Sequence, residues 1–330
     1  MLIASNYHYI RDSFDSKYPS IFGLTPDEFK SQIEAMSKIG KFIHPKDISF
    51  SKKKISSKSK IFWLLTFDDG LKEQYQIAYP ILKELGIPAI FFINPINVKE
   101  RIISFVHQFH IFRSNFSSIE IKNCFNNLID KNILKLNDLE RVKAHNHYKY
   151  DDDISSQFKY LINFKLSNDI STKLINYAFK KMISEDVDKI NRKLYMSESE
   201  IKKLGRDDLI GSHSYRHLKL SSMKDDELDK DISYSSLILK NIVGKIPYSF
   251  SYPYGSNDSI DRRVIKLLKK NGYEWGITME RAIGKTVYKK SDFNIQTLFT
   301  IDKNLKDGMI SKYITNQKSI DDKKPIVKAF

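Results

Sequence analysis

Three short segments of the chain contain residues that could do chemistry, and each directly follows an apolar stretch. The first is TFDDG at residues 66–70, where Asp68 and Asp69 come after the uncharged stretch 61–67. Adjacent carboxylates at a strand end can point in different directions, one to a metal ion and the other to a water molecule. Asp69 could instead cap the next helix while Asp68 faces solvent, and Asp-Asp-Gly alone favours that simpler interpretation.

The second segment, GSHSYRH at residues 211–217, places His213 and His217 four residues apart after a short apolar stretch. This spacing puts both rings on the same side of a helical turn, and neutral imidazoles are good ligands for zinc-like metals. By themselves, two unrelated histidines are the simpler interpretation. Together with Asp69, however, they supply one carboxylate and two imidazoles, the three-ligand set of a catalytic metal with an open position.

The third segment is SYPYG at residues 251–255, in which Pro253 and Tyr254 follow another expected strand. A turn of this kind can direct a backbone N–H at a substrate oxygen, and its aromatic ring can form the wall of a sugar pocket. Considered alone, the segment predicts a turn and nothing more.

The stretches between these motifs predict the elements that position them. Residues 61–67, 71–85 and 89–93 read as strand, helix and strand, which together form a βαβ unit. A helix is expected to begin at Thr25, because Pro26 and Glu28 complete an N-terminal capping pattern. Further strands are expected at 2–9, 209–211, 248–252, 275–278 and 293–301. This alternation predicts an α/β fold, a distorted (β/α) barrel whose carboxyl edge carries all three motifs.

Residues 99–195 interrupt this alternation, because their pattern is helical, polar and poor in strands. We therefore expect one catalytic domain over 1–330 that contains a helical insertion at 99–195. The basic C-terminal segment 281–330 is expected to complete the barrel. The run HNHYKYDDD at 145–153 is expected to be a solvated loop.

In residue type, order and context, the three motifs resemble those of the polysaccharide deacetylase family with the NodB homology domain, carbohydrate esterase family 4. TFDDG, HSYRH and SYPYG match its motifs, and the resemblance covers roughly residues 1–95 and 195–280. It implies a barrel of the NodB deacetylase type. It also implies that Asp69, His213 and His217 hold a divalent metal, Zn²⁺ in the first place, with Co²⁺, Ni²⁺ or Fe²⁺ as alternatives.

The resemblance also implies roles for the neighbouring residues. Asp68 would be the general base, the backbone N–H of Tyr254, beside Pro253, would stabilise the oxyanion, and Ser214 would support the histidine ligands from behind. Two features depart from the family pattern. The position of an arginine that orients the base reads Phe250 or Ser251, and no histidine follows His217 to act as the general acid. His8, at the end of the first expected strand, could replace that acid or line the pocket.

The expected function is metal-dependent hydrolysis of an N-acyl group, acetyl or formyl, from an amino sugar. Its substrate would be a polysaccharide or a cytoplasmic precursor, nucleotide- or lipid-linked. Two other classes stay open. A catalytically inactive glycan-binding barrel is suggested by the missing acid, and a nucleic-acid or membrane-surface binder by the charge.

Composition limits these alternatives. The 330 residues include 55 Lys and Arg against 40 Asp and Glu, a formal charge of +15, but no nucleic-acid-binding motif, so no nucleic-acid partner is expected. The single cysteine, Cys124, excludes an internal disulfide and a cysteine-based zinc site. The sequence shows no basic segment followed by an apolar leader, and no apolar run of membrane-spanning length. We therefore expect a cytoplasmic protein without a transmembrane segment.

Overall fold

The computed structural model describes residues 2–18, 21–50, 61–128, 135–148, 151–256, 259–279 and 294–299. The chain divides into two compact units. The barrel unit comprises Met1–Ser13, Phe22–Ile102 and Ile190–Phe330, and the helical unit comprises Phe14–Ile21 and Ile103–Lys189.

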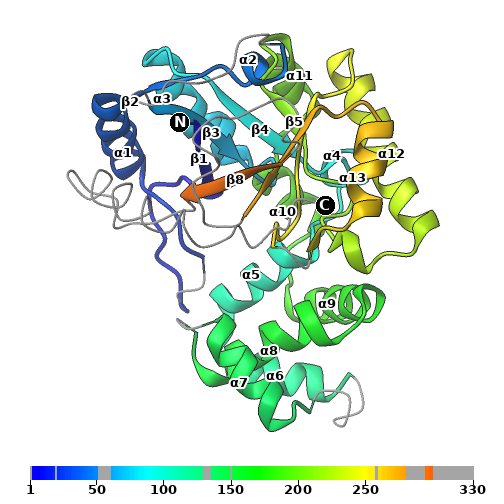
Figure 1. Ribbon diagram of the computed structural model, residues 1–330. Helices are drawn as coiled ribbons and strands as arrows, with labels where there is room; N and C mark the ends of the chain where they lie inside the picture. Colours follow the sequence, from blue (N-terminus) through cyan, green and yellow to red (C-terminus); the bar gives the residue numbers. More distant parts are fainter. Residues whose placement is uncertain are drawn as a thin grey trace. The chain divides into compact units, whose positions relative to one another are not determined.

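The strands of the barrel unit pair in parallel throughout and form an eight-stranded sheet (Figure 1). They follow the order β1-β8-β7-β6-β5-β4-β3-β2, and β1 also pairs with β3, from Leu2 beside Phe62 to Tyr7 beside Phe67. This last pairing closes the sheet into a barrel, and β2 lies along the first residues of β3. The predicted (β/α) barrel is therefore confirmed. The strands are β1 (Leu2–Tyr7), β2 (Gly40–Phe42), β3 (Ile61–Phe67), β4 (Ala89–Ile93), β5 (Ile210–Ser212), β6 (Ser249–Ser251), β7 (Trp275–Thr278) and β8 (Asn294–Phe299).

The helices of this unit begin where the sequence signals them. Thr25 and Glu28 form the predicted capping box of α1, and Ser197 and Glu200 form another at the start of α11. The helix predicted over 71–85 is less regular, since it begins with a π-helical turn, η1. The helices are α1 (Pro26–Ile39), α2 (Pro45–Phe50), η1 (Gln74–Ala78), α3 (Tyr79–Glu84), α4 (Pro95–Lys99), α10 (Val187–Leu194), where the chain returns to this unit, α11 (Glu198–Arg206), the 3-10 turn η3 (Leu220–Ser222), α12 (Asp225–Val243) and α13 (Arg262–Lys270).

The barrel has apolar residues on both faces of its strands. On β3, Trp63, Leu65 and Phe67 pack outward with the helices, whereas Leu64 packs with Trp275 in a second, inner cluster. Because side chains alternate along a strand, Thr66 continues the face of Leu64. The inner face therefore changes from apolar to polar as it approaches the carboxyl edge of the barrel.

The helical unit is built on its own core, in which Phe112 and Phe179 are fully buried and their rings lie 5.4 Å apart. The unit consists of residues 103–189 together with residues 14–21. The predicted insertion at 99–195 extends beyond the first of these ranges at both ends. His145 and His147 lie in a helix, so the loop prediction for them was wrong. The unit contains α5 (Phe105–Asn115), α6 (Ser118–Asn126), α7 (Asp138–His147), α8 (Asp153–Tyr160), the π-helical turn η2 (Leu161–Lys165) and α9 (Asn168–Met182).

Most of the basic segment 281–330, which was expected to complete the barrel, lies outside the described residues. Within that segment, β8 pairs with both β7 and β1. Among the described helices, none has the length and apolarity needed to cross a membrane.

Candidate active site

The parallel strands deliver polar residues to one edge of the barrel. Asp68 and Asp69 directly follow β3, His213 follows β5, and His8 follows β1. Because all carboxyl ends of parallel strands meet at the same edge, residues far apart in sequence become neighbours there. Asn94, directly after β4, joins them and was not predicted from the sequence.

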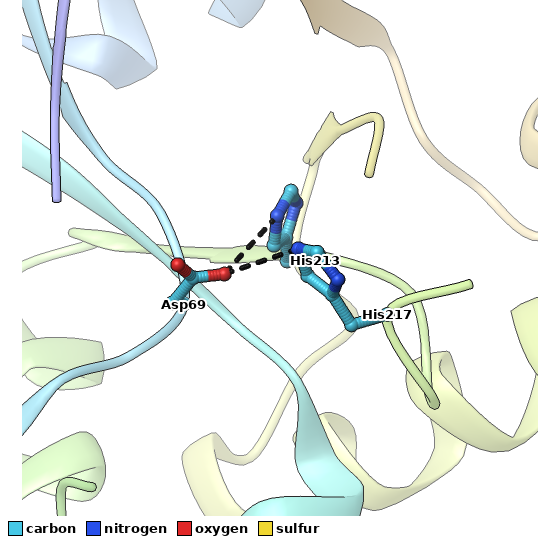
Figure 2. A group of neighbouring side chains, drawn as sticks. All are labelled: Asp69, His213 and His217. Atoms are coloured by element: carbon cyan, nitrogen blue, oxygen red, sulfur yellow. Dashed lines mark ion pairs between the residues drawn. The ribbon is translucent and has the colours of Figure 1, made fainter. Parts of the chain in front are cut away.

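Asp69, His213 and His217 converge on one point, as Figure 2 shows. Asp69 Oδ1 lies 3.5 Å from His213 Nε2 and 3.2 Å from His217 Nε2. The three candidate ligand atoms all lie within 4.8 Å of one another, and all three residues are buried. One carboxylate oxygen and two imidazole nitrogens fit a divalent, zinc-like cation. The sequence prediction had named the same three residues.

The ring of His213 is fixed by a backbone group. Its Nδ1 lies 2.8 Å from the carbonyl oxygen of Ser251, the last residue of β6. A carbonyl oxygen can only accept, so Nδ1 carries the proton and Nε2 presents its lone pair towards Asp69. The sequence could not show this contact, because it depends on the neighbouring positions of β5 and β6.

The two histidines do not lie on a helical turn, so that part of the sequence interpretation was wrong. Ser214 and His217 both have left-handed backbones, with φ of 62° and 56°, and left-handed residues end a helix. The Ser214 hydroxyl accepts a hydrogen bond from the His217 backbone N–H at 3.1 Å. Ser214 therefore stabilises the turn that positions His217. The sequence had suggested that Ser214 supports the metal ligands as a neighbouring group.

Unusual backbone conformations concentrate at this edge of the barrel. Six non-glycine residues among those described have positive φ, and four of them belong to the motifs. Besides Ser214 and His217, these are Asp69 (φ 77°) and Tyr254 (φ 63°). Such conformations cost free energy and persist where the surroundings enforce them, which is typical of functional sites.

The loop between the two histidines is held by buried acceptors and donors. Asp231, on the buried face of α12, accepts hydrogen bonds from the Tyr215 backbone N–H at 2.8 Å and from Arg216 Nε at 3.0 Å. From the other side, the Asn94 side-chain amide donates to the carbonyl oxygens of His213 and Ser214. A carboxylate on the buried, largely apolar face of α12 was the one sequence signal that could have identified Asp231.

If Asp69, His213 and His217 bind Zn²⁺, we expect Asp231→Ala to weaken that binding by about 10- to 100-fold, as is common when groups behind metal ligands are removed. The loop that carries both histidines would lose two anchors while every ligand stays in place. The measurement is zinc affinity by competition with a chelator. Asp229→Ala is the matched control, because Asp229 is on the same helix with a side chain that is 46% exposed. Unchanged zinc affinity in folded Asp231→Ala would show that the loop needs no such anchor.

Asp68 directly precedes Asp69 and is buried. Its backbone N–H donates to the Tyr7 carbonyl at 3.0 Å, which continues the pairing of β1 and β3. Asn6 Nδ2 donates to Asp68 Oδ2 at 2.8 Å, whereas Oδ1 has no hydrogen-bond partner among the described residues. Burial raises the pKa of Asp68 to about 6; the His8 ring lowers this pKa, and the charge of Asp69 raises it.

His8 lies at the open side of this pair. Its Nε2 is 4.0 Å from Asp68 Oδ2 and 4.0 Å from Asp69 Oδ2, and its side chain is 25% exposed. One hydrogen-bonded atom between them could therefore link the ring to either carboxylate, and the ring has access to solvent. This position is compatible with a proton donor or a pocket wall.

The third motif lies beside His217. Pro253 is buried and Tyr254 half-buried, and the ring of Tyr254 lies 5.4 Å from that of His217. Gly255 follows with φ of 50°, and a Cβ there would come within 2.4 Å of the Met279 backbone nitrogen. A glycine is therefore required for the chain to turn away after Tyr254.

A comparison with known protein families identifies the family to which this chain belongs. The sequence profile of the family described as "Polysaccharide deacetylase" matches residues 56–147 and 171–276, more than half of the chain. The chain belongs to the polysaccharide deacetylase family. Asp68 and Asp69 lie in the first matched segment, and His213, His217 and Tyr254 lie in the second.

One curated relative is the poly-beta-1,6-N-acetyl-D-glucosamine N-deacetylase of Staphylococcus aureus (strain MSSA476), which is 33% identical over 102 residues. That alignment covers 28% of this chain and 35% of the relative, so it spans about a third of the curated protein. Asn6 and His8 precede the first segment that matches the deacetylase family profile, and nothing in that match bears on them.

Solved deacetylase structures share the fold. A de-N-acetylase from Aggregatibacter actinomycetemcomitans superposes with a TM-score of 0.56 at 14% identity, covering 94% of this chain and 99% of that one. The deacetylase PplD of Streptococcus pyogenes, solved with acetate, gives 0.54 at 12% identity, covering 96% and 97%. IcaB from Ammonifex degensii gives 0.53 at 16% identity, covering 94% and 96%. At these identities the likeness shows that this polysaccharide deacetylase shares their fold.

Proposed function

We propose that the chain is a metal-dependent N-deacetylase that hydrolyses an N-acyl group, acetyl or formyl, of an amino sugar in a polysaccharide or in its precursor. The observation that carries this proposal is the placement of the buried Asp68 beside three buried metal-ligand candidates. Membership of the deacetylase family and the name of the curated relative support the reaction and the sugar class.

Asp69, His213 and His217 would hold the cation, with Zn²⁺ first and Co²⁺, Ni²⁺ or Fe²⁺ as alternatives. When bound, such a cation polarises an amide carbonyl and makes a water molecule more acidic. Asp68 would take the proton of the attacking water at Oδ1, since its other oxygen is engaged by Asn6. The backbone N–H of Tyr254, beside the buried Pro253, would donate to the oxygen that becomes negative in the tetrahedral intermediate.

The amine must leave with a proton. Among the residues near Asp68, His8 has a side chain that is 25% exposed and a ring nitrogen, Nε2, that lies 4.0 Å from an oxygen of each carboxylate. We assign the proton donation to His8 Nε2, while Asp68, once it has taken the proton of water, is the alternative donor.

His8→Ala is expected to lower kcat by about 10- to 100-fold, less than loss of the base, because protonated Asp68 can still supply the leaving amine. Bound metal should stay at the level of the unaltered chain, since His8 is not one of the three ligand candidates. The measurement is kcat together with metal content on the same sample. His44→Ala is a matched control, as His44 follows β2 near the opposite, amino end of the strands. Unchanged kcat in His8→Ala would leave the donation to Asp68.

The proposed activity is tested by measuring released acetate or formate from two substrates. One is an oligomer of N-acetylated glucosamine, and the other is a nucleotide-linked N-acetyl amino sugar, which the net charge of +15 would attract through its phosphates. Release from either that stops with a chelator supports the proposal. Glycan binding without any release would instead indicate an inactive binding barrel, and salt-sensitive binding to DNA or anionic vesicles alone would indicate a polyanion binder.

A further inference from the structure

The Asn6 side chain donates a hydrogen bond to the Asp68 carboxylate. Its Nδ2 donates to Asp68 Oδ2 at 2.8 Å and contacts Met279 Sδ at 3.1 Å. Its Oδ1 accepts from the Thr66 hydroxyl at 2.7 Å. Both ends of the amide are therefore engaged, and the side chain is 1% exposed.

The position of Asn6 follows from the strand register. Asn6 of β1 pairs with Thr66 of β3, and Asp68 lies two residues beyond Thr66. Because side chains alternate along strands, the three side chains point to the same, inner face of the barrel. The pairing of the two strands thus sets the height of the amide relative to the carboxylate.

The groups at its two ends account for the orientation of the Asn6 amide. A carboxylate can only accept, so the NH₂ group faces Asp68, whereas an oxygen in that place would leave the carboxylate without this donor. The Thr66 hydroxyl, which can donate or accept, donates to the amide oxygen that this orientation presents to it. Asp68 therefore sets the orientation, Thr66 satisfies the amide oxygen, and the amide occupies Oδ2 of Asp68.

We propose that Asn6 is a positioning residue for the general base, held in place by the hydrogen bond that its amide oxygen accepts from Thr66. By occupying Oδ2, it fixes the carboxylate plane and leaves Oδ1 to accept the proton of water. This inference rests on the proposed deacetylase function. At the third motif, the Phe250 ring packs edge-to-face against Tyr252 and Tyr273 and offers no polar group to the base. The Ser251 side chain is a second polar group that interacts with the Asp68 carboxylate.

Asn6→Ala is expected to lower kcat by about 10- to 100-fold, with KM and bound metal unchanged. Asn6→Asp keeps the volume but replaces the donor by a second carboxylate, and it should lower kcat at least as much. Thr66→Val, which keeps the shape and removes the hydroxyl, should lower kcat several-fold, whereas Thr66→Ser should retain it. Asn191→Ala is the matched control, because this buried asparagine donates to the carbonyls of Asn97 and Ile102.

A second measurement separates positioning from general stability. In an Asp68→Asn background, adding Asn6→Ala should not lower the residual rate further, because a positioning residue acts through the base. Independent rate losses that multiply would overturn the inference, as would full kcat in Asn6→Ala or better activity in Asn6→Asp than in Asn6→Ala. If the unaltered chain releases neither acetate nor formate, the proposed function fails and this inference fails with it. If the unaltered chain is active and only the variants give an overturning result, this inference fails and the proposed function stands.

Discussion

Asp68→Asn should retain one metal ion per chain and lose turnover by about 10²- to 10⁴-fold, the range expected when a general base is removed. The amide is close in size to the carboxylate, so the packing around residue 68 is kept. The amide cannot accept a proton at pH 7, however, and accepting the proton is the role assigned to Asp68 Oδ1, which has no hydrogen-bond partner among the described residues.

The measurement combines kcat for acetate release with metal content on the same preparation. Asp225→Asn is a suitable control, because Asp225 is a largely exposed carboxylate that pairs with Arg263 at the start of α12. Loss of metal in Asp68→Asn would mean that the roles of Asp68 and Asp69 are exchanged. Unchanged turnover would remove Asp68 from the chemistry.

His213→Ala should abolish stable metal binding and reduce turnover at least as far as Asp68→Asn does. The change removes one of the three candidate ligands, the imidazole ring that the Ser251 carbonyl orients. Two ligands hold a divalent cation poorly, because each remaining bond must offset the loss of water from the ion.

This variant is checked by metal analysis after dialysis, with His145→Ala as the control. His145 is an exposed histidine of the helical unit, 3.8 Å from Asp153. Full metal content in His213→Ala would exclude His213 as a ligand. A folded, metal-free variant with full activity would contradict the metal-dependent mechanism itself.

Much of the barrel could be predicted from the sequence because its signals are local. The uncharged stretch 61–67 predicts β3, and Thr25 predicts the start of α1, without reference to distant parts of the chain. Both elements lie where they were expected. The metal-ligand candidates could be predicted because Asp69, His213 and His217 all follow such strands. What places them together is the shared carboxyl edge of parallel strands.

Other parts of the site depend on contacts between distant segments. Asn6 is an ordinary polar residue in its strand until the register with Thr66 places it against Asp68. Asp231 acquires its role only when α12 packs against the histidine loop. The helical interpretation of the two histidines failed for the same reason, since tertiary anchors enforce left-handed conformations that spacing does not reveal.

The most direct test of the account measures acetate release and bound metal on one sample of the unaltered chain, before and after chelation and again after Zn²⁺ is returned. An N-acetylated glucosamine oligomer serves as the substrate. We predict about one ion per chain at the start, loss of release with loss of metal, and recovery of both with Zn²⁺. Undiminished release by the metal-free protein would contradict the account.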